Sequence, residues 1–156
     1  MNYIEHKRLR ILLFEDNDML RSMLYCLLRE QRWEVIGYPE PEECPLRHAT
    51  KCACTQARVC ADVILTDLEM PHVDGFTFVH DLLETGCKVP FLAMFTACED
   101  EARLARAREF GFAVFSKYHG LGPLLAWLHD VEKQVDARRL LTSRAELLRR
   151  SPGLLS

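Results

Sequence analysis

The stretch that most constrains the fold of this chain covers residues 61–75, with the sequence ADVILTDLEMPHVDG. Its short apolar run at 63–65 contains two β-branched residues, which favours a central parallel strand covered on both faces. The run ends before Asp67, and the turn signals Pro71 and Asp74-Gly75 follow. A carboxylate directly after a buried strand lies where open α/β sheets keep their ligand sites. Asp67 is therefore a candidate functional residue, with a helix cap or turn residue as the structural alternative.

Other apolar runs of the chain also end in polar residues. Residues 9–14 are followed by Glu15-Asp16, residues 89–95 by Thr96-Ala97, and residues 112–115 by Ser116-Lys117. Parallel, adjacent strands would bring these two acids, the hydroxyl and the amine to one edge of a sheet, together with Asp67.

Helical patterns separate the predicted strands. Apolar residues recur at helical spacing after the Asn17-Asp18 cap, over 76–84 and over 120–135, and Glu99-Asp100 opens a further helix. A second strand is predicted over 33–37, and a weaker helical pattern covers 46–58. This alternation predicts an α/β domain with a parallel sheet and helices on both faces.

The residues Glu15-Asp16, Asp67, Thr96 and Lys117, with Pro71 and Asp74-Gly75 after the central acid, resemble the receiver domain of two-component response regulators. The resemblance covers about residues 9–128. It implies a flavodoxin-like (βα)5 fold, in which a doubly wound, parallel five-stranded sheet has the strand order 2-1-3-4-5.

The resemblance also implies the roles of the site residues. Asp67 would accept a phosphoryl group, and Asp16 and Asp67 would bind Mg²⁺ directly, with Glu15 acting through water and the Glu69 backbone carbonyl as a further ligand. Lys117, the Thr96 hydroxyl and the Ala97 backbone amide would contact phosphoryl oxygens. The chemistry is consistent with these roles, because a carboxylate is a weak nucleophile and Mg²⁺ prefers oxygen ligands.

Three positions depart from the family pattern or add to it. Val114 stands where the family has an aromatic residue that rearranges on phosphorylation, and Tyr118 stands where proline usually follows the lysine. Glu69 places a further acid two residues after Asp67, and we expect it to affect hydrolysis of the phosphoaspartate. We expect the signalling readout to differ because valine has no hydroxyl and little reach.

Four of the seven cysteines, Cys44, Cys52, Cys54 and Cys60, lie in the irregular segment 38–60. Four thiols in one short connection predict a tetrahedral Zn²⁺ site. An iron–sulfur cluster and a set of reduced or adventitiously oxidised thiols are the alternatives. Cys26 and Cys87 fit small core or helix-end residues.

The 156 residues suffice for one well-packed domain, which we expect over 1–137, with a C-terminal helical tail over 138–156. Ser143 and Glu146 fit a capping box for a helix over 144–150. We expect this helix to pack back on the domain rather than to bind a partner. A net charge of −3 argues against direct nucleic-acid binding, and the lack of an apolar span argues against membrane insertion. We therefore expect a cytoplasmic protein with reduced thiols.

The sequence predicts a single-domain bacterial response regulator, phosphorylated by a sensor histidine kinase or phosphotransfer protein. It would not be an enzyme in its own right, and it would act on an unknown downstream protein as a monomer or a phosphorylation-linked homodimer. Two alternatives remain. One is a metal- or redox-responsive binding protein that uses the cysteines, and the other is an aspartyl-phosphate hydrolase or phosphotransferase.

Overall fold

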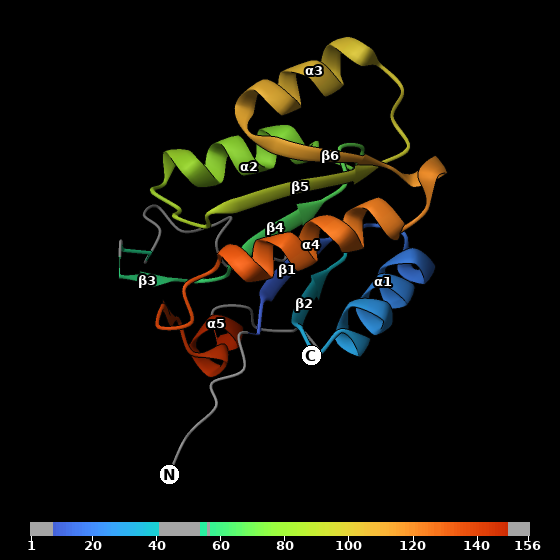
Figure 1. Ribbon diagram of the computed structural model, residues 1–156. Coiled ribbons are helices and arrows are strands. Elements are labelled where there is room, and N and C mark those ends of the chain that lie inside the picture. Colours follow the sequence, from blue (N-terminus) through green and yellow to red (C-terminus); the bar gives the residue numbers. More distant parts are fainter. Residues whose placement is uncertain (1–7, 41–53, 56, 150–156) are drawn as a thin grey trace.

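The computed structural model describes residues 8–40, 54–55 and 57–149. Its centre is a parallel five-stranded sheet in the order β2-β1-β4-β5-β6 (Figure 1). The strands are β1 (Arg10–Phe14), β2 (Glu34–Tyr38), β4 (Val63–Thr66), β5 (Phe91–Thr96) and β6 (Phe112–Ser116). Because β3 lies outside this sheet, the order is the predicted 2-1-3-4-5 arrangement, and the predicted fold class is confirmed.

Helices cover both faces of the sheet (Figure 1). Alternate residues of β1 point to opposite faces, as the pleat of a strand requires. Ile11 and Leu13 join one apolar cluster with α1 (Asp18–Glu30) and α4 (Gly122–Gln134). Leu12 and Phe14 join a second cluster with α2 (Gly75–Glu84) and α3 (Glu101–Phe110).

Local chemistry sets the helix ends. The side chains of Asn17, Asp74 and Asp100 each accept hydrogen bonds from backbone amides in the first turn of α1, α2 and α3. Gly111 ends α3 with φ of 116°, a left-handed conformation that glycine adopts without steric cost. Each of these three helices therefore begins or ends next to a capping residue visible in the sequence.

The segment between β2 and β4 differs from the prediction. The expected helix over 46–58 is wrong at its C-terminal end, where Arg58 begins the short strand β3 (Arg58–Val59); residues 46–53 lie outside the described part of the chain. β3 pairs in parallel with β7 (Leu140–Leu141) from the C-terminal tail. At Arg58 and Val59, pairing with a strand 82 residues away takes the place of the predicted helix end.

The tail continues into α5 (Arg144–Arg149), whose start is capped by Ser143 accepting a hydrogen bond from the Glu146 amide. Leu147 is 1% exposed and belongs to the same apolar cluster as α2 and α3. The prediction that this helix packs back on the domain is therefore confirmed. Within the described residues, no helix combines the length and apolar character needed to cross a membrane.

Candidate functional site

The site lies at the edge of the sheet where the parallel strands end. In the sheet register Phe14 of β1 pairs with Thr66 of β4, so Glu15 and Asp67 follow their strands at the same level. The Asp67 amide donates to the Phe14 carbonyl over 3.2 Å, which extends the pairing to the acid itself. The backbone thus fixes the position of both acids.

Three acids gather at this edge. One carboxylate oxygen from each of Glu15, Asp16 and Asp67 lies within 4.8 Å of the others. Glu15 and Asp67 are buried, at 2% and 5% exposure, whereas Asp16 is exposed. Two buried carboxylates beside a third, reachable from solvent, form a strongly negative set of oxygen ligands.

Lys117 brings the positive charge of the site. It opens a 3₁₀ turn (Lys117–His119) directly after β6. Its Nζ donates to Asp67 Oδ2 over 2.5 Å and to Glu15 Oε2 over 3.0 Å. Burial alone would lower the pKa of Lys117, but its hydrogen bonds to the two carboxylates and their charges outweigh burial and raise the pKa. Lys117 therefore remains protonated at neutral pH.

The pKa of Glu15 is raised above its ordinary value of 4.5, mainly because burial disfavours the carboxylate. Hydrogen bonds and charge from Lys117 and the amide of Asn17 oppose this shift, and the charge of Asp67 adds to it. The ammonium thus contacts two of the three clustered carboxylates, and a further cation would relieve the repulsion among them.

The loop after Asp67 is held close to the sheet. Gly75 donates its amide to the Leu68 carbonyl over 2.9 Å. A Cβ at Gly75 would lie 2.0 Å from the backbone oxygen of Asp67, so no other residue fits without moving the backbone. The first residue of α2 must therefore be glycine for the helix to approach the acid this closely.

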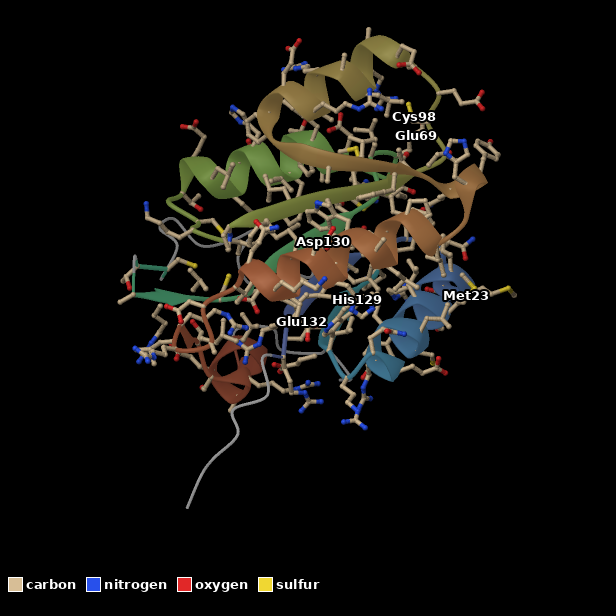
Figure 2. All side chains as sticks on the ribbon, viewed as in Figure 1. Met23, Glu69, Cys98, His129, Asp130 and Glu132 are labelled. Carbon is tan, nitrogen blue, oxygen red and sulfur yellow. The ribbon has the colours of Figure 1, made fainter. Side chains whose placement is uncertain are left out.

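Glu69 points away from the carboxylates. Its amide donates to Asp67 Oδ1 over 3.2 Å, but its side chain pairs with Arg103 of α3 at 3.3 Å. Arg103 also lies 3.8 Å from Cys98 Sγ, and Figure 2 shows Glu69 and Cys98 near the loop between β5 and α3. The sequence analysis missed Arg103, because nothing local links it to a residue 34 positions away.

Thr96 is 1% exposed at the end of β5, and its hydroxyl accepts a hydrogen bond from the Cys98 amide over 3.1 Å. It lines a pocket of about 390 Å³ beside α3, next to the edge of the sheet where the carboxylates lie. Val114 and the 70% exposed Tyr118 also line this pocket. The Lys117–Tyr118 peptide is trans, like all peptides in the described chain.

The predicted zinc ligands are only partly described. Cys44 and Cys52 lie outside the described residues. Cys54 and Cys60 are neighbours, since the Cys60 amide donates to Cys54 Sγ over 3.3 Å. Cys87 joins them, although the sequence suggested a simple core or helix-end residue, and Cys26 is exposed on α1 rather than in the core.

A sequence profile of the response regulator receiver domain matches residues 11–118. The match spans the five-stranded sheet from β1 to β6 and all the acids described above. The chain belongs to the response regulator receiver domain family. The prediction made from the residues at the strand ends is thereby confirmed.

Comparisons with individual proteins agree with this assignment. The chain is 30% identical, over 142 residues, to a protein-glutamate methylesterase/protein-glutamine glutaminase of Cereibacter sphaeroides. That alignment covers 90% of this chain but 36% of the relative, so the chain spans about a third of the relative's length.

Two solved structures show the same fold. The N-terminal domain of an uncharacterized protein from Wolinella succinogenes is 27% identical with a TM-score of 0.65, over 81% of this chain and 95% of that one. The response regulator TrrA of Thermotoga maritima, in complex with Mg²⁺ and BeF, is 18% identical with a TM-score of 0.60, over 78% and 97% of the two chains. At this low identity the second match shows the fold alone.

Proposed function

We propose that Asp67 accepts a phosphoryl group in a Mg²⁺-dependent reaction and that the receiver domain signals its phosphorylation through protein contacts. The observation that carries the proposal is the position of Lys117, whose Nζ lies 2.5 Å from Asp67 Oδ2 at the carboxyl edge of the sheet. An ammonium there would neutralise the charge of an incoming phosphoryl group, which a carboxylate nucleophile needs.

The donor set fits Mg²⁺. Glu15, Asp16 and Asp67 supply oxygen atoms within 4.8 Å of one another, and hard divalent cations prefer such ligands. Asp16 and Asp67 would hold the ion directly, Glu15 through water, and the Glu69 carbonyl would add a backbone ligand. The ion would supply charge neutralisation for the phosphoryl oxygens. The TrrA structure, a Mg²⁺ and BeF complex of the same fold, supports this assignment.

The proposal includes two further contacts, made by the hydroxyl of Thr96 and the backbone amide of Ala97. Thr96 is the last residue of β5 and Ala97 follows it, and β5 pairs with β4 on one side and with β6 on the other. Both groups would donate to phosphoryl oxygens once the hydroxyl of Thr96 turns from its present bond with Cys98. Val114 would not fill the pocket beside Thr96 as an aromatic residue would, so the downstream protein would meet a different surface.

Receiver domains interact with histidine kinases or phosphotransfer proteins, and we propose a donor of this class for Asp67. The output would be a contact with another protein, made by the receiver domain as a monomer or a phosphorylation-linked homodimer in the cytoplasm. No direct contact with nucleic acid or membrane is part of the proposal.

Intact-mass measurement after incubation with a small phosphodonor tests the proposal. Wild-type protein should gain one phosphoryl mass with Mg²⁺ and lose the gain when the metal is chelated. Asp67→Ala should gain none. Asp130→Ala is the matched control, because Asp130 is an exposed acid on α4 and should leave phosphorylation unchanged (Figure 2).

Two results would contradict the proposal. Equal phosphorylation of wild type and Asp67→Ala would place the acceptor elsewhere. Sustained turnover of a phosphate ester would instead favour the hydrolase or phosphotransferase alternative.

A further inference from the structure

A second group of metal-binding side chains lies away from the acids. One Sγ from each of Cys54, Cys60 and Cys87 lies within 4.8 Å of the other two. Cys54 and Cys60 lie before and after β3 in the sequence. Cys87 lies further along the chain, after β4 and just beyond the end of α2. Three thiols from two separate segments therefore meet at one point.

The spacing of these sulfur atoms suits a tetrahedral cation. With Zn–S bonds of about 2.3 Å, tetrahedral ligands lie about 3.8 Å apart. Because the three sulfur atoms already lie within 4.8 Å of one another, each needs to move by no more than about 1 Å, which side-chain rotation can supply.

The surroundings also favour a bound metal. Cys60 and Cys87 are 3% and 6% exposed within the apolar cluster under α2, whereas Cys54 is half-buried and offers a route of entry. The Cys60 amide donates to Cys54 Sγ over 3.3 Å, and such hydrogen bonds orient and stabilise thiolate ligands. Soft thiolates select Zn²⁺ over the hard cations that suit the acids.

We propose that Cys54, Cys60 and Cys87 bind Zn²⁺ as thiolates, releasing their three protons to solvent, with one coordination position left to another ligand. This set shares Cys54 and Cys60 with the sequence-based prediction and adds Cys87. The inference is independent of phosphorylation at Asp67. Its structural effect is to fasten the segment around β3 to the end of α2.

Zinc binding at these cysteines would also affect the C-terminal tail. β3 pairs with β7, and the Thr142 amide donates to the Val59 carbonyl over 3.0 Å. A metal ion that fixes Cys54 and Cys60 also fixes β3, which lies between them in the sequence. Because β3 pairs with β7, the ion would fix the C-terminal tail as well. Zinc should therefore stabilise the folded chain as a ligand specific to the native state.

The test uses the full chain, purified under reducing conditions, stripped of metal and titrated with Zn²⁺ alone. We expect one zinc per chain and a higher melting temperature. X-ray absorption at the zinc edge should show at least three sulfur ligands at about 2.3 Å. Cys87→Ser should weaken zinc binding at least tenfold. Cys26→Ser is the matched control, since Cys26 is exposed on α1, and it should bind like wild type.

Circular dichroism of each metal-free variant separates loss of the site from loss of the fold. If Cys87→Ser does not fold, the Cys44→Ser/Cys52→Ser double variant decides the question, because it keeps the three proposed ligands and should still bind one zinc per chain. No stoichiometric zinc, fewer than three sulfur ligands, or a folded Cys87→Ser protein with wild-type affinity would each overturn the proposal. Wild-type zinc affinity in a folded Cys87→Ser protein would instead favour the sequence-based set of ligands, Cys44, Cys52, Cys54 and Cys60.

Discussion

The guanidinium of Arg139, in the turn before β7, donates hydrogen bonds to the carboxylate of Asp62, the residue before β4. Asp62 is fully buried, and its Oδ2 also accepts the backbone amide of Arg10 over 2.9 Å. The Arg10 side chain in turn donates to the Thr142 carbonyl over 2.5 Å. The C-terminal tail is thus joined to the amino-terminal edge of the sheet by buried charged groups.

Replacing Arg139 should reveal the cost of leaving Asp62 without its cation. We expect Arg139→Ala to lower the free energy of unfolding by about 3–5 kcal/mol, because removal of one partner leaves a buried charge uncompensated. Urea denaturation measures the change. Arg138→Ala is the control, since Arg138 is exposed. Equal stability of the two variants would show that the pair does not support the fold.

Leu147 should be the main apolar attachment of α5. Because it is 1% exposed, Leu147→Ala should cost about 2–5 kcal/mol through lost burial and a cavity. Leu140→Ala removes the same atoms from a 56% exposed position and should change stability by no more than about 0.5 kcal/mol. Thermal unfolding of both variants compares them directly, and similar losses would contradict the packing of α5 on the domain.

Glu15 should make the metal-free protein less stable as pH rises. Its folded pKa lies above the ordinary 4.5, so the folded state holds the proton more tightly than the unfolded state. This contribution to stability is fully present below pH 4.5 and is lost as pH rises through the folded pKa. Without metal, Glu15→Gln should therefore be more stable than wild type near neutral pH, by a margin that shrinks in acid.

The same variant should bind Mg²⁺ about 10–100-fold more weakly, as expected when an outer-sphere carboxylate is lost. Denaturation across pH and Mg²⁺ titration measure the two effects. Glu30→Gln, an exposed change at the end of α1, should alter neither. A Glu15→Gln protein that is less stable at neutral pH, or that keeps full Mg²⁺ affinity, would contradict the assigned role.

The pocket beside Val114 should accept a larger side chain. Val114→Phe would extend into the space of about 390 Å³ and should keep stability within about 1 kcal/mol of wild type. Ala93→Phe, at a fully buried position of β5, should cost about 1–3 kcal/mol by overpacking. Chemical denaturation compares the pair. A larger loss for Val114→Phe would mean that the pocket does not admit an aromatic ring from β6.

Much of the fold follows from local patterns. Apolar runs marked the five strands of the sheet, and Asn17 and Asp100 marked helix starts, because strand alternation, helical spacing and capping act over a few residues. The sequence also showed that acids follow the first and third strands of the sheet and that a lysine follows the fifth. Parallel strands then bring Asp67 and Lys117 together, since their carboxyl ends share one edge.

The sequence by itself therefore determined the sheet, most helix ends and the candidate acidic site. Only the tertiary structure decided that β3 pairs with β7, that Arg139 neutralises Asp62, and that Cys87 meets Cys54 and Cys60. The physical reason is distance along the chain. These contacts join segments that share no local periodicity, and they form only once the core has placed the segments side by side.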